Sequence, residues 1–208
     1  MRKNILLPLI VLALLTFSCN DTVQNASNDE VSGDAETIVV DEQDNNDEDE
    51  WGNKTKMDYY SSRTGIIMKF VDVNLPDLSI KFGRAKTRIR TLKYGGDDVC
   101  FYQIEKEGGY GTSVASIEYS DLLDVIKAME VLESEVSVDL QSNPDYLENK
   151  YTTIDGFQIG YYVSGGKATW YIRLERFGSG NTLFLNDGGE ILQSMETAKS
   201  KIEELKQL

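Results

Sequence analysis

The 208-residue sequence contains no histidine, only two cysteines and only three prolines. Histidine is the commonest general base near neutral pH and the commonest metal ligand. Its absence excludes Ser-His-Asp and Cys-His catalysis and every zinc site that uses imidazole. Two cysteines are too few for a zinc cluster or a disulfide framework. We therefore expect no metal and no cofactor.

Positive charge is missing from residues 20–50, which contain twelve Asp and Glu residues and neither Lys nor Arg. The formal net charge of the whole chain is −14, so this segment supplies most of it. Its few apolar residues cannot bury a core, and its like charges repel one another and extend the chain. We interpret residues 19–50 as a disordered acidic tether. Because such a segment repels phosphates, we expect no nucleic-acid partner.

One long apolar run stands near the N-terminus. Arg2 and Lys3 precede thirteen uncharged residues, Ile5–Phe17, and Ser18-Cys19 follow directly. A helix that spans a membrane needs about 20 apolar residues. A shorter run after a basic start is typical of a secretory signal peptide, so we expect residues 1–18 to be removed.

Residues 1 to about 21 resemble a bacterial lipoprotein signal cut by signal peptidase II, of the relaxed Ser-Cys type found in Bacteroidetes. The resemblance implies a diacylglyceryl thioether on Cys19, with further acylation, because one acyl chain alone attaches a protein only weakly. Asn20 replaces the Asp that marks inner-membrane retention in enteric bacteria, which implies the outer membrane of the cell envelope. The alternative is ordinary cleavage before Cys19, which could then pair with Cys100 in an oxidising compartment.

Residues 51–208 are predicted to form one α+β domain. Alternation of apolar and polar residues indicates strands, and apolar stripes indicate helices. Asp187 and Glu190 stand at capping-box spacing at the start of the last helix. The strands are expected near 65–73, 78–83, 86–94, 98–106, 113–118, 151–155, 157–163, 168–176 and 181–186, and the helices near 120–135 and 188–206.

The domain contains an internal repeat. Shifting the first half by 70 residues places the turn Gly95-Gly96 on Gly165-Gly166 and Phe101 on Tyr171. The order of elements is also shared. We predict two similar antiparallel β-meander-plus-helix units, about 65–136 and 150–206, whose helices cover one face of the sheets.

Two sets of charged residues are candidate functional sites. Glu105 and Glu175 occupy matching positions and would form a catalytic carboxylate pair if they faced each other about 5–9 Å apart. Their basic neighbours favour a plainer role as exposed charges. A basic run would either pair with acids of the same domain or bind an anionic partner such as lipopolysaccharide or an acidic glycan. This run consists of Lys81, Arg84, Lys86, Arg88, Arg90 and Lys93.

The remaining chemistry-bearing residues suggest a packed core. Cys100 lies in a strand pattern and is expected to be a buried small residue, and the many aromatic residues suit a β core better than sugar stacking. The sequence thus predicts a lipid-anchored, non-enzymatic binding or scaffold module with a protein or anionic glycan partner. The alternatives are a His-independent glycan hydrolase and an inhibitor or immunity-type lipoprotein.

Overall fold

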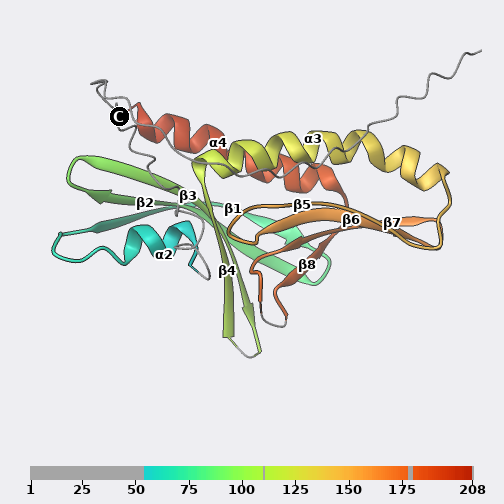
Figure 1. Cartoon of the computed structure of the whole chain (residues 1–208), viewed down its shortest axis with the longest axis horizontal. Helices are drawn as coiled ribbons and strands as arrows, with labels where there is room; N and C mark the ends of the chain where they lie inside the picture. Colours follow the sequence, from blue (N-terminus) through green and yellow to red (C-terminus); the bar gives the residue numbers. More distant parts are fainter. Residues whose placement is uncertain (1–53, 110, 178–179, 208) are drawn as a thin grey trace, which may run out of the picture. The chain divides into compact units, whose positions relative to one another are not determined.

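The computed structural model describes residues 54–109, 111–177 and 180–207 (Figure 1). The predicted signal peptide, Cys19 and the acidic tether lie outside these residues. No helix in the described ranges is long and apolar enough to cross a membrane. The elements are α2 (Lys56–Ser61), β1 (Lys69–Ile80), β2 (Gly83–Tyr94), β3 (Asp97–Gly108), β4 (Gly111–Glu118), α3 (Tyr119–Gln141), β5 (Leu147–Thr152), β6 (Gln158–Ser164), β7 (Lys167–Arg173), β8 (Thr182–Leu185) and α4 (Gly188–Lys206).

The strands form two four-stranded antiparallel sheets, in the orders β1-β2-β3-β4 and β5-β6-β7-β8. A long helix follows each sheet in the chain, so the predicted α+β fold with two similar units is confirmed. Gly95-Gly96 joins β2 to β3, and Gly165-Gly166 joins β6 to β7. All four glycines have positive φ, as two-residue hairpin turns require. We call β1 to α3 the first half and β5 to α4 the second half.

Each long helix packs mainly on the sheet of the other half. Helix α3 contacts β5, β6 and β7, whereas α4 contacts β1, β2 and β3, and the two helices also contact each other (Figure 1). A tyrosine hydroxyl fixes each pairing: Tyr102 on β3 bonds with Ser194 on α4 at 2.7 Å, and Tyr161 on β6 donates to Asp139 on α3 at 2.5 Å. The buried apolar side chains of both halves therefore form one continuous core.

The first half differs from the prediction at β1. The strands expected near 65–73 and 78–83 are one strand, with a bulge between Leu75 and Leu78. The bulge contains Pro76, which has no N–H to donate to a ladder, and the carbonyl of Pro76 accepts a hydrogen bond from Thr87 Oγ1 at 2.8 Å. The chain accommodates this proline at a bulge on an edge strand, so the strand continues.

The prediction for the first long helix also needs correction. Helix α3 continues to Gln141, beyond the expected end near 135, because Val136 and Leu140 still pack against the core. Its N-cap is Glu118, whose carboxylate accepts from the backbone N–H of Ser120 at 2.9 Å. Asp187 is the N-cap of α4, as its spacing from Glu190 predicted.

The hairpins of the first half are the longer ones and reach the second half. Strands β1, β2 and β3 have twelve residues each, whereas β5, β6 and β7 have six or seven. Beyond the end of β1, the backbone N–H of Lys81 donates to the carbonyl of Phe184 on β8 at 2.8 Å. On β4, the N–H of Val114 donates to the Glu175 carboxylate at 3.0 Å. These bonds satisfy backbone groups at strand edges and join the halves.

Candidate functional site

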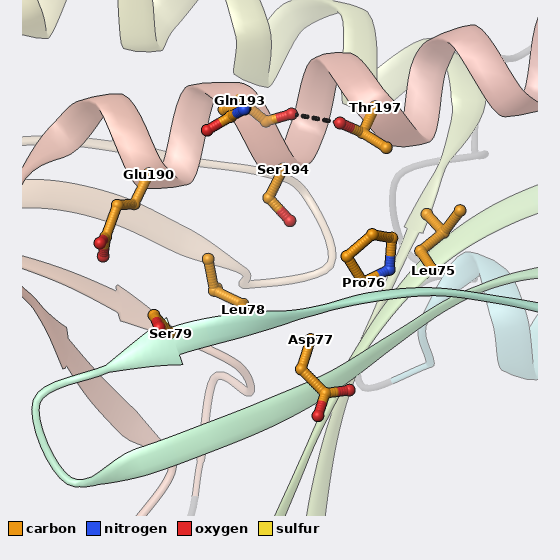
Figure 2. A pocket seen from close by; sticks show the side chains of 9 residues that line it. All are labelled: Leu75, Pro76, Asp77, Leu78, Ser79, Glu190, Gln193, Ser194 and Thr197. Atoms are coloured by element: carbon orange, nitrogen blue, oxygen red, sulfur yellow. Dashed lines mark hydrogen bonds between the residues drawn. The ribbon is translucent and has the colours of Figure 1, made fainter.

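A groove lies between β1 and the first turns of α4, beside the bulge of β1 (Figure 2). Its volume is about 270 Å³, which is just below the range for small-molecule sites. The residues that line it are Leu75, Pro76, Asp77, Leu78 and Ser79 from β1 and Glu190, Gln193, Ser194 and Thr197 from α4.

The side of the groove formed by α4 is polar because of helical spacing. Positions separated by three, four and seven residues lie on one face of a helix, and the four lining residues of α4 have this spacing. Next to this face runs the apolar stripe of α4, which is buried in the core and consists of Ile191, Met195, Ala198 and Ile202. The bulge provides the opposite wall, and bulges are often found beside functional sites.

Two of the groove's hydroxyls are already bonded within the protein. Ser194 Oγ lies 2.7 Å from the hydroxyl of Tyr102, and Thr197 Oγ1 donates to the carbonyl of Gln193 at 2.7 Å. Complete burial raises the pKa of Tyr102 to about 12, so its hydroxyl stays protonated at neutral pH. These contacts orient the hydroxyls without activating them.

Glu190 is the exception among the groove residues. Figure 2 shows its side chain reaching from α4 toward β1. Its backbone N–H is bound by the Asp187 carboxylate at 3.0 Å, but its own Oε2 atom is buried and has no hydrogen-bond partner among the described residues. A buried carboxylate oxygen without a donor is unfavourable.

The basic run lies along β1–β2 and is largely paired with acids of the same sheet. Arg90 binds Asp72 through two hydrogen bonds of 2.8 and 2.7 Å, and these bonds lower the pKa of the Asp72 carboxyl. Arg88 Nη1 lies 2.8 Å from Glu105 Oε2. Lys86 and Lys93 pair with Glu107 and Asp98, while Lys81 and Arg84 lie exposed at the end of the hairpin. This pairing favours internal ion pairs over an anion-binding patch.

Glu105 and Glu175 both come close to Val114 on β4. Glu105 stands opposite Val114 in the β3–β4 ladder, and Glu175 accepts the N–H of Val114. Glu105 is bound by Arg88, so each carboxylate has a partner of its own. Neither residue lines the groove.

The aromatic residues and Cys100 mostly belong to the core. Tyr102, Tyr161 and Trp170 are buried, and the last two form an edge-to-face pair with ring centroids 4.8 Å apart. Cys100 is buried, with its Sγ 3.5 Å from Thr91 Oγ1. Tyr146 differs, because it is 62% exposed and stacks on Tyr162 outside the core.

The sequence did not predict the groove. The polar stripe of α4 was a usable signal, since Glu190, Gln193, Ser194 and Thr197 have helical spacing next to a buried face. The opposite wall had no such signal, because a bulge is not visible in the sequence. Within residues 54–109, 111–177 and 180–207, no group of three or more Cys, Asp or Glu residues is placed to hold a metal ion.

Comparison of the chain with protein-family models, with curated proteins and with solved structures gives no significant match.

Proposed function

We propose that the protein is a non-enzymatic binding or scaffold module, held at the outer membrane of the cell envelope by a lipid on Cys19. Its binding surface is the groove between β1 and α4. The observation that carries this proposal is the groove itself, where the hydroxyls of Ser194 and Thr197 are held by Tyr102 and by the Gln193 carbonyl beside the bulge of β1.

The geometry of the groove supports recognition better than catalysis. A nucleophilic serine needs a base within hydrogen-bond reach. The partner of Ser194 is Tyr102, whose raised pKa keeps it protonated at neutral pH, so it cannot take the serine proton. Glu105 and Glu175, the carboxylates that a glycan hydrolase would need, are held by Arg88 and by the N–H of Val114.

Site-specific photo-crosslinking in cells tests the groove. A benzoylphenylalanine at Gln193, which lines the groove, should give an adduct on irradiation. The matched control is the same residue at Lys127, which is exposed on α3 and does not line the groove. Equal adducts from both positions, or none from Gln193, would contradict the assignment of the groove as the binding surface.

The membrane anchor needs a separate test. Cys19→Ser should abolish labelling by a palmitate analogue and release the protein from the membrane fraction. Deletion of residues 20–50 should leave labelling intact and serves as the control. Persistent labelling of the Cys19→Ser protein would refute lipidation at this residue.

A further inference from the structure

The loop between α2 and β1, residues 62–68, exposes large apolar side chains close together. Ile67 is 94% exposed and Ile66 is 46% exposed, and Phe70, the second residue of β1, is 48% exposed. Elsewhere among the described residues, exposed large apolar side chains stand singly in the sequence, which is ordinary for a protein surface. Three of them within five residues form an apolar patch, and such a patch indicates an interaction surface.

The patch stands on a packed base. Helix α2 covers the outer face of the first sheet, where the ring of Tyr60 lies edge-on to Phe101 with centroids 6.1 Å apart. Gly65 has a φ of 77°, which lets the chain turn back from α2 toward β1. Figure 1 shows this loop projecting at one end of the domain, opposite to the end at which α3 leads into β5.

Two cations flank the patch. Arg63 stacks on Tyr94, with its guanidinium carbon 4.7 Å from the ring centroid, and this contact holds the charge at the base of the loop. Lys69 is exposed beside Phe70. Unlike the paired cations of β2, neither forms an ion pair with a carboxylate in the described ranges. Apolar side chains flanked by such cations suit the interface of an anionic bilayer, with the former at the acyl boundary and the latter at the phosphates.

The chain enters the domain near this loop. Only α2, with six residues, separates Lys54 from it. Residues 20–53 link Lys54 to Cys19 and span at most about 120 Å, so a lipid on Cys19 keeps the loop within reach of the bilayer. Contact by a tethered loop is intramolecular, and a weak contact then suffices. Because anionic headgroups repel the acidic tether, the domain's own surface must supply the contact.

We propose that the α2–β1 loop inserts Ile66 and Ile67 into the surface of the anionic phospholipid bilayer that holds the lipid on Cys19, with Arg63 and Lys69 at the phosphate groups. This inference rests on the proposed lipid anchor. It adds a second contact with the membrane, which gives the domain a fixed orientation on the bilayer.

The test uses the lipidated protein in vesicles of phosphatidylethanolamine and phosphatidylglycerol. A nitrobenzoxadiazole label is attached to Thr64→Cys in the loop or, in a second protein, to Asp145→Cys, which is exposed after α3 at the other end of the domain. Cys100 is buried and does not react. We expect the label at position 64, and not that at position 145, to show blue-shifted emission and quenching by lipids that carry a nitroxide on an acyl chain.

Matched variants assign the signal to the patch. Ile66→Ser with Ile67→Ser should abolish both the blue shift and the quenching at position 64, because the inserting side chains are gone. Val131→Ser with Val138→Ser, at two exposed positions of α3, is the control and should keep both. Exchange of phosphatidylglycerol for phosphatidylcholine should reduce the quenching, because Arg63 and Lys69 lose their anionic partners.

The inference is overturned if the protein floats with the vesicles while the label at position 64 stays in water, if the two serine pairs act alike, or if the lipid exchange changes nothing. A blue shift without quenching by nitroxide lipids also overturns it, since a second copy or another protein then covers the loop. Protein that does not float refutes the anchor on Cys19 and this inference with it, whereas floating without quenching leaves the anchor standing.

Discussion

The two halves of the domain have the same order of elements but differ at corresponding corners. The corner between β5 and α3 is closed by α2, whose Lys56 binds Asp121 and Asp155. The corner between β1 and α4 is an open groove. The repeat therefore keeps the order of the elements, while the contacts at the corresponding corners differ.

The outer faces of the two sheets differ as well. On the first sheet, Arg90 takes part in a row of ion pairs with Asp72. The 70-residue shift places Gly160 at the position of Arg90, and a Cβ atom on Gly160 would lie 2.3 Å from the carbonyl oxygen of Asn149. At this position the second sheet therefore has close packing of β6 against β5, where the first sheet has an ion pair. Equivalent positions of a repeat keep their place in the sheet but not their chemistry.

The largest expected effect concerns α4, the helix of the second half that packs on the first sheet. Met195→Ala should lower the free energy of unfolding by about 2–5 kcal/mol, because Met195 is buried and the change leaves a cavity. Since α4 lies on the first sheet, both halves should still unfold in one transition. Urea unfolding followed by circular dichroism and by Trp170 fluorescence, with Trp51→Phe in all proteins, measures this.

The control for that change is Ser200→Ala on the exposed side of α4, which should alter stability by no more than about 0.5 kcal/mol. Two separate transitions, one seen by fluorescence and one by circular dichroism, would show that the halves are independent domains. The crossed packing of the helices would then not hold the two halves together.

A smaller effect is expected at the closed corner. The Lys56 side chain is 22% exposed, and Lys56→Met should cost about 1–3 kcal/mol by leaving Asp121 without its charged partner. Because the pKa of Lys56 is raised from 10.5, its contribution is complete below that pH and is lost as the pH rises through the raised pKa. The difference between the two proteins in chemical unfolding should therefore be constant from pH 7 to 9.

Lys54→Met is the matched control, since Lys54 is exposed just before α2, and it should have little effect. Equal losses from the two variants would mean that the contacts of Lys56 do not stabilise the closed corner. The corner between β5 and α3 would then not depend on Lys56.

The smallest effect is expected on the outer face of the first sheet. The Asp72 side chain is 36% exposed, so solvent screens its pair with Arg90, and Asp72→Asn should cost less than about 1 kcal/mol at pH 7. The hydrogen bond from Arg90 lowers the pKa of Asp72. Its contribution is thus present above about pH 3.8 and disappears as the pH falls through the lowered pKa.

Unfolding free energies of the Asp72→Asn and unaltered proteins, measured at pH 7 and again at pH 2.5, should differ more at the first pH than at the second. Asp145→Asn, in an exposed loop, is the control. A difference that stays the same at both pH values would show that Asp72 acts through packing and not through its charge.

Local patterns in the sequence were sufficient to predict the internal repeat. The Gly-Gly pairs predicted the two hairpin turns, because few other residues adopt positive φ at both positions. The apolar stripe of α4 predicted which of its residues are buried, and Asp187 predicted where it begins. Each of these features depends on residues close together in the chain, so the sequence carries the signal directly.

The groove and the partner of each helix depend on contacts between distant residues. An apolar stripe such as Ile191, Met195 and Ala198 indicates that a helix has a buried face. It does not indicate which sheet covers that face. The bulge at Pro76-Asp77 depends on Thr87, which satisfies the carbonyl of Pro76 from the next strand. The sequence by itself determined the elements, the turns and the repeat. The tertiary structure decided that the helices cross between the halves and that one corner is filled by Lys56 while the other is open, because packing and charge pairing join residues far apart in the chain.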